Sequence, residues 1–232
     1  VGSLSNIRSR DVKRARDQTQ FYYELEQKWG ERVVNKIREL GSDVLIQQSS
    51  WGGPGYLQEI QSLSAGSDLF DFMGKHGYWE HPHGGWSPME AYFGNRAVTK
   101  NPVDASLFHT MWQHIEGVPF VISEWNFCQP SDYVNDAGPM LAAYGAMQGI
   151  NATHRFNLTR AEKAKRLNEI FDVFDPTGGM MIEPFSYFMF VRRDVTKAPV
   201  IFRQSLDDEA LHDPQRKKGS KLEESTNRFY MN

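Results

Sequence analysis

A carboxylate, an indole and an amide follow one another at the end of a short apolar run, in the sequence Val118-Pro-Phe-Val-Ile-Ser-Glu-Trp-Asn126. These residue types suit a sugar site. The carboxylate of Glu124 can attack an anomeric carbon, the ring of Trp125 can stack on a pyranose face, and the amide of Asn126 can bond a hydroxyl. A glutamate that only caps a strand or forms a salt bridge would give the same pattern, so both interpretations stay open.

Histidines and a second carboxylate gather in the sequence Lys75-His-Gly-Tyr-Trp-Glu-His-Pro-His83. A metal site would need converging imidazoles held by neighbouring hydrogen bonds, and His81 and His83 flank a proline in a glycine-rich stretch. We therefore favour an interpretation without metal, in which His76 contacts a substrate and His81 closes the loop. Glu80 is the best second carboxylate within this chain.

Four tryptophans lie in or just past predicted strand ends: Trp51, Trp79, Trp86 and Trp125. Aromatic rings exposed at such positions can stack on sugar faces, and they can equally pack between a loop and the sheet. As a set they favour a carbohydrate ligand. We expect Trp125 and Trp51 to line a pocket with His76 and Tyr78.

The elements that must position these side chains alternate between strands and helices. Hydrophobic periodicity predicts a helix over residues 11–40, ended by Gly41. Strands are predicted over residues 43–48, 69–73, 120–123 and 150–156, and further helices over 103–116, 138–149 and 184–193. Such alternation indicates βα units around a parallel sheet. Glu124 would then follow the third strand, at the end where α/β barrels place their chemistry.

Composition narrows the class of protein. The 232 residues suffice for one substantial core, and the net charge of −3 gives no general attraction to nucleic acid or to an anionic membrane. The single cysteine, Cys128, excludes an internal disulfide and a cysteine zinc cluster, and is expected to be a small, partly buried thiol. No apolar run has the length of a membrane span. The chain begins at Val1 without Met, so we expect a processed product or part of a longer polypeptide.

Three segments, over residues 71–82, 117–126 and 138–145, together resemble the second half of clan A retaining glycoside hydrolases. These enzymes are (β/α)8 TIM barrels with a nucleophilic glutamate after strand seven. The resemblance covers residues 10–195 and implies that Glu124 is the nucleophile and that His76 and Tyr78 hold it or contact the substrate. Trp125 and Asn126 match substrate-facing positions of the family. Trp51 and Trp79 are expected to bind substrate because of their places at predicted strand ends.

The implied fold is α/β, the C-terminal half of a TIM barrel. Residues 1–195 would carry strands five to eight, and residues 196–232 would be a C-terminal extension that starts a small β domain or is disordered. The implied activity is retaining β-glycoside hydrolysis without any metal or organic cofactor. A polymeric sugar as substrate would favour a secreted or periplasmic location.

Retaining hydrolysis needs a second carboxyl about 5–5.5 Å from the nucleophile, as acid and base. In the family this glutamate follows an asparagine at the end of strand four. The only Asn-Glu pair here, Asn168-Glu169, comes after the nucleophile in a predicted helical stretch and does not match. We therefore expect an N-terminal half-barrel segment or a second polypeptide to supply it.

Two other classes of function remain open on the sequence. A non-catalytic carbohydrate-binding or scaffold protein would keep the aromatic cleft on a degenerate barrel and lack the acid/base residue. A metal-dependent enzyme would instead use the cluster formed by His76, His81 and His83.

Overall fold

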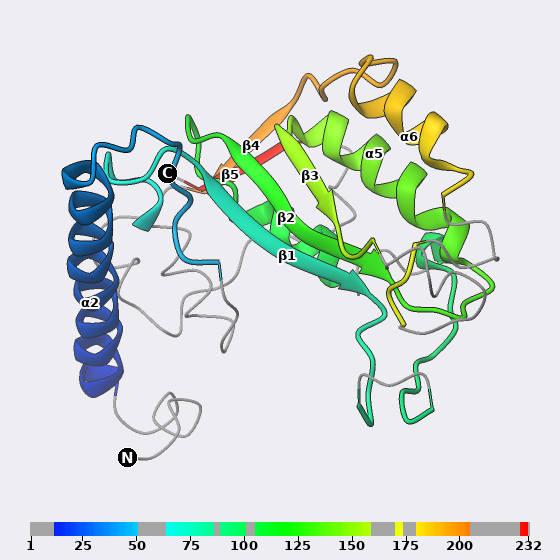
Figure 1. Cartoon of the computed structure of the whole chain (residues 1–232), viewed down its shortest axis with the longest axis horizontal. Coiled ribbons are helices and arrows are strands. Elements are labelled where there is room, and N and C mark those ends of the chain that lie inside the picture. Colours follow the sequence, from blue (N-terminus) through cyan, green and yellow to red (C-terminus); the bar gives the residue numbers. More distant parts are fainter. Residues whose placement is uncertain are drawn as a thin grey trace.

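The protein has an α/β fold built on a small parallel sheet. The computed structural model describes residues 12–50, 64–85, 89–100, 105–158, 170–173, 180–204 and 228–231. The sheet has the strand order β1 (Met73–Trp79), β2 (Phe120–Phe127), β3 (Ala152–Arg155), and both pairs are parallel (Figure 1). The α/β class and the parallel strands predicted from the sequence are thereby confirmed, whereas the half-barrel stays a prediction.

The helices that flank this sheet are α2 (Val12–Glu39), α4 (Ser106–His109), which continues as the 3-10 helix η3 (Thr110–Gln113), α5 (Ala137–Gln148) and α6 (Glu183–Phe190). The structure also has the short 3-10 helices η1 (Val98–Lys100) and η4 (Val134–Asp136). A second sheet joins β4 (Ile201–Gln204) to β5 (Arg228–Met231) in parallel. No helix in the described part of the chain is long and apolar enough to span a membrane.

The predicted helices agree with the structure better than the predicted strands. The long helix and the small-residue helix appear as α2 and α5, and each is followed by a glycine with positive φ, Gly41 (+79°) and Gly149 (+80°). The strand predicted over residues 43–48 is reduced to a single bridge between Gln47 and Phe72. The strand predicted over 69–73 begins only at Met73 and runs on to Trp79.

Glycines explain the misplaced strand. Gly74 and Gly77 lie inside β1, Met73-Gly-Lys-His-Gly-Tyr-Trp79, although glycine weakens a strand. In the structure both are sites of close approach. A Cβ on Gly77 would lie 2.6 Å from the Cα of Leu107 in α4, and a Cβ on Gly74 would collide with the side chain of Gln47. The glycines therefore let β1 pack against its neighbours.

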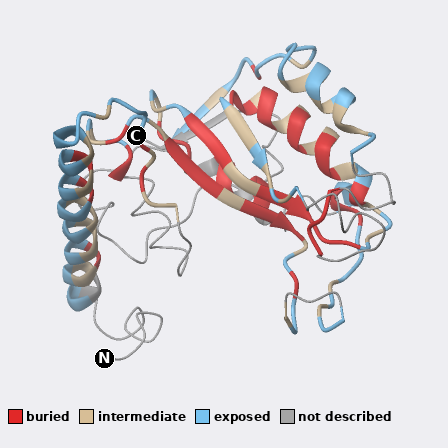
Figure 2. Cartoon of the chain, in the orientation of Figure 1, coloured by how far each residue is buried: buried red, intermediate tan, exposed pale blue. Residues whose placement is uncertain are grey.

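The main core lies on one face of the sheet. It is formed by alternate strand residues and by α4, η3 and α5, and includes Met73, Trp79, Leu107, Phe108, Phe120, Ile122, Trp125, Phe127 and Leu141. Figure 2 shows this buried layer along the sheet and the facing side of α5. No helix among the described residues covers the opposite face of β1 and β2, which we call the open face (Figure 1).

Candidate active site

The open face carries a carboxylate held between an imidazole and a phenol. Glu124 on β2 pairs in register with His76 on β1, and their side chains are 31% and 28% exposed. Nδ1 of His76 lies 3.6 Å from Oε2 of Glu124, and the hydroxyl of Tyr78 donates a hydrogen bond to Oε1. Three side chains predicted as site residues thus meet on two neighbouring strands.

A β-bulge directs Glu124 to this face. Lys75 pairs with Ile122 and His76 with Glu124, so Ser123 is an extra residue on β2, and its hydroxyl donates to the Lys75 carbonyl at 3.4 Å. In strict alternation Glu124 would share the core-facing side with Ile122. The bulge shifts the alternation by one position, as bulges near active sites often do.

Tyr78 is held as a neutral hydrogen-bond donor. Its ring is buried against Phe171, with centroids 4.6 Å apart, and its edge meets His81. Burial raises the pKa of Tyr78, and the hydrogen bond to the Glu124 carboxylate raises it further. The phenol is therefore protonated near neutral pH. On the other side of Glu124, Nε2 of His76 lies 3.5 Å from the hydroxyl of Ser50.

Trp125 and Asn126 differ from the expectation that they face a substrate. Trp125 is only 4% exposed and lies in the main core, with the Arg155 guanidinium 5.2 Å from its ring centroid. Consecutive strand residues point to opposite faces, so the residue after Glu124 turns toward the helices. Their burial argues against direct contact of either side chain with a sugar.

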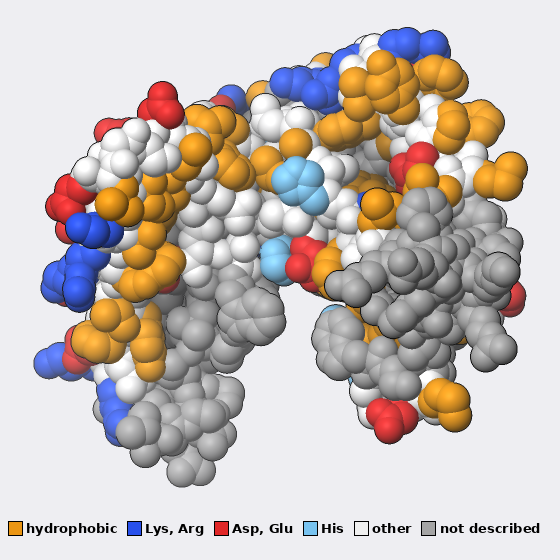
Figure 3. Space-filling view, in the orientation of Figure 1, with side chains coloured by type: hydrophobic (Ala, Val, Ile, Leu, Met, Phe, Trp, Pro, Cys, Tyr) orange, Lys and Arg blue, Asp and Glu red, His pale blue; other side chains and the backbone are white. Residues whose placement is uncertain are grey.

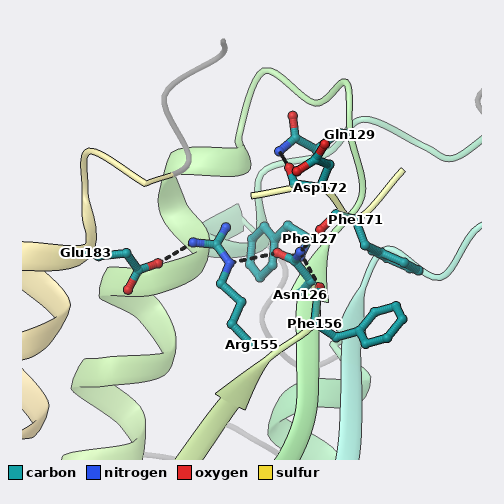
Figure 4. A network of polar contacts seen from close by, with 8 residues as sticks. All are labelled: Asn126, Phe127, Gln129, Arg155, Phe156, Phe171, Asp172 and Glu183. Atoms are coloured by element: carbon teal, nitrogen blue, oxygen red, sulfur yellow. Dashed lines mark hydrogen bonds and ion pairs between the residues drawn. The ribbon is translucent and has the colours of Figure 1, made fainter. Parts of the chain in front are cut away.

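Asn126 has a structural role instead, at the centre of the network in Figure 4. Its amide nitrogen donates to the backbone carbonyls of Phe156 and Phe171 at 2.5 and 2.7 Å, and its oxygen accepts from Nε of Arg155 at 3.1 Å. Arg155 also forms an ion pair with Glu183 at the start of α6. Burial lowers the pKa of Arg155, and the charge of Glu183 opposes that shift.

This network was not foreseen from the sequence. Arg155 and Glu183 are 28 residues apart, and nothing in their local pattern links them. One signal could have indicated that Arg155 has a partner. It lies near the end of a short predicted strand, where a buried charge needs an opposite charge or a hydrogen bond. The network ties β2, β3 and α6 together beside Glu124.

The remaining predicted site residues lie elsewhere. Trp79 is buried in the main core, and its indole nitrogen donates to the Arg96 carbonyl at 2.9 Å. Trp51 and Trp86 lie outside the described residues, as does the Asn168-Glu169 pair. Their expected positions stay predictions.

Glu80 is not free to serve as the second carboxylate. One oxygen accepts from the backbone N–H of Gly94 and the other is paired with Arg96. These contacts join the two ends of the loop that follows β1. In the same loop His83 and Tyr92 exchange backbone hydrogen bonds of 3.0 Å. Within the described ranges, no three His, Cys, Asp or Glu side chains gather as a metal site.

The arrangement can support several reactions of a carboxylate. A carboxylate that is partly exposed, oriented by a phenol and flanked by an imidazole can act as a nucleophile, as a base or as a hydrogen-bond acceptor for a ligand. Comparisons with protein-family models, with curated proteins and with solved structures found no match.

Proposed function

We propose that the protein is a retaining β-glycoside hydrolase in which Glu124 is the nucleophile. The observation that carries the proposal is the placement of Glu124 on the open face, with Tyr78 donating to one oxygen and His76 beside the other. The three sequence segments that resemble clan A hydrolases support it. We also propose that residues 43–48, β1, β2 and β3 correspond to strands five to eight of a TIM barrel.

The reaction proceeds in two displacements. A carboxylate oxygen of Glu124 bonds to the anomeric carbon while the bond to the leaving oxygen breaks, and an acid protonates that oxygen. The same group, now a base, takes a proton from water, which attacks the anomeric carbon and releases Glu124. Tyr78 holds the carboxylate in one orientation, and His76 contacts Glu124 and the sugar.

The acid/base carboxylate is assigned to a polypeptide segment outside residues 1–232, either an N-terminal half-barrel segment or a second chain. Two observations support this. Glu80 is engaged by Gly94 and Arg96. Apolar side chains are exposed beside the sheet edge at residues 43–48, among them Val44 and Leu45. A strand added at this edge would cover these side chains.

The nucleophile can be tested on this chain alone. A 2-deoxy-2-fluoro glycoside with a dinitrophenolate leaving group needs no acid to depart, so the missing acid does not block the first displacement. A panel in gluco, galacto, manno and xylo configurations should include one reagent that labels the peptide containing Glu124, as found by mass spectrometry. Glu124→Gln should abolish labelling.

Labelling of another carboxylate, or equal labelling of Glu124→Gln, would refute the assignment. The engagement of Glu80 also favours a second candidate, a carbohydrate-binding protein without catalysis. That function predicts saturable sugar binding with no labelling by any reagent of the panel. The two outcomes separate the two functions in one experiment.

A further inference from the structure

β3 brings a second histidine to the open face. In β3, Thr153 pairs with Ile122 and Arg155 with Trp125, and both partners belong to the main core. Arg155 confirms that orientation, because it contacts the ring of Trp125 and Glu183 of α6. Side chains alternate along a strand, so His154 must point to the opposite, open face. It is exposed to solvent there.

The strand register places His154 beside Glu124. Ile122 and Trp125 bracket Ser123 and Glu124 on β2, just as Thr153 and Arg155 bracket His154 on β3. Neighbouring strands lie about 4.8 Å apart, so side chains opposite each other on one face can reach the same ligand. Figure 3 shows histidine and acidic side chains in the hollow over the sheet.

We propose that His154 is a substrate-binding residue that contacts, from the β3 side, the sugar held at Glu124. This inference rests on the proposed function. The site then has His76 on β1, Glu124 on β2 and His154 on β3, so the carboxylate lies between the two imidazoles. A neutral imidazole offers one donor and one acceptor, which matches a sugar hydroxyl. Ala152, two residues earlier on the same face, is small and leaves room for the ring.

The test uses the imidazole NMR signals of the 15N-histidine-labelled chain, assigned with His76→Asn and His154→Asn. An iminosugar whose nitrogen replaces the anomeric carbon is a suitable probe, because the protonated nitrogen pairs with a carboxylate. When an iminosugar of the configuration that binds is added, the imidazole signals of His76 and His154 should both shift and should follow the same saturation curve. His83, exposed in the loop after β1, should not move.

Affinity gives a second readout. His154→Ala should weaken iminosugar binding about tenfold, the loss of one ligand hydrogen bond, and His154→Asn should recover part of it. His83→Ala should bind like the wild type. If His76 shifts while His154 stays fixed and His154→Ala binds normally, the role of His154 is refuted and the proposed function stands. If no iminosugar moves either histidine, both are refuted.

Discussion

The two oxygens of the Glu124 carboxylate have different neighbours. Oε1 accepts from the Tyr78 phenol, and Oε2 faces the His76 imidazole at 3.6 Å. The raised pKa of Tyr78 keeps its proton on the phenol up to strongly alkaline pH, so this hydrogen bond persists throughout the neutral range. One oxygen is thus fixed and the other is available to a ligand.

Cys128, just beyond β2, is a probe for the integrity of this strand end. Its side chain is 1% exposed, and burial, with the charge of Glu80 adding to it, raises the thiol pKa from 9.0 to about 12. The thiolate is the reactive form. We therefore expect reaction with Ellman's reagent at pH 8 to be about a thousandfold slower in the native protein than in urea.

Absorbance of the released thionitrobenzoate measures both rates, and Cys128→Ala provides the blank because the chain has a single cysteine. Stoichiometric reaction within minutes in native buffer would mean that the segment after β2 opens readily. In that case the anchoring of the strand end by Asn126 would also be in doubt.

At the level of elements, the ends of β2 and β3 are joined by buried polar contacts. The Asn126 amide supplies donors to two backbone carbonyls that come from separate loops, at Phe156 and Phe171. The Phe171 carbonyl also accepts from the Asn157 N–H at 3.0 Å, so the amide is its second donor. The amide therefore fixes the loop that carries Phe171, and through Phe171 it supports the ring of Tyr78.

Asn126→Asp should lower the free energy of unfolding by about 3 kcal/mol, because it removes both donors and places a carboxylate against two carbonyl oxygens. Asn151→Asp is the matched control. Among the described residues, the Asn151 side chain is hydrogen-bonded only through its oxygen, which accepts from the Phe120 N–H at 2.9 Å, and an aspartate keeps that acceptor. Urea unfolding of the two variants should separate them clearly. Equal stabilities would contradict the role of the amide.

The sequence predicted α2 and α5, but it placed Glu124 after a strand that ends at residue 123, whereas β2 continues to Phe127 and contains Glu124. It also failed where side-chain direction depends on strand pairing. Helical periodicity and terminal glycines are local signals, and α2 and α5 agree with them. The face of the sheet to which Trp125 points follows from alternation along the strand. The face to which Glu124 points depends on a bulge, which can be identified only from the pairing with the neighbouring strands. Asn126 shares the face of Glu124 but is covered by backbone from distant segments.

For the whole molecule, the distribution of apolar surface is uneven. One face of the sheet is packed by α4, η3 and α5, whereas α2 presents Phe21, Leu25 and Trp29 to solvent at successive helical turns. Figure 3 shows hydrophobic side chains gathered along the helix at the left. Contiguous apolar surface of this kind marks an interaction site or causes self-association.

The double variant Leu25→Glu/Trp29→Glu should reduce self-association and binding of the dye ANS by the isolated chain. Both side chains are about half exposed, so unfolding free energy should change by less than about 1 kcal/mol. Sedimentation velocity and dye fluorescence measure the two effects. Gln20→Glu, on the exposed polar side of α2, should leave both unchanged. A wild-type chain that stays monomeric and dye-free at high concentration would contradict this expectation.

The extra residue in β2 has a consequence for how this site can be inherited. Without Ser123 the strand would read Phe-Val-Ile-Glu-Trp-Asn-Phe, which already alternates between core and open face. The glutamate would still stand opposite His76, since Ile122 already pairs with Lys75. A lineage can therefore gain or lose this codon while keeping the same residues on each face. Insertions and deletions are usually confined to loops. Here a one-residue insertion or deletion inside a strand would leave the carboxylate on the same face of the sheet.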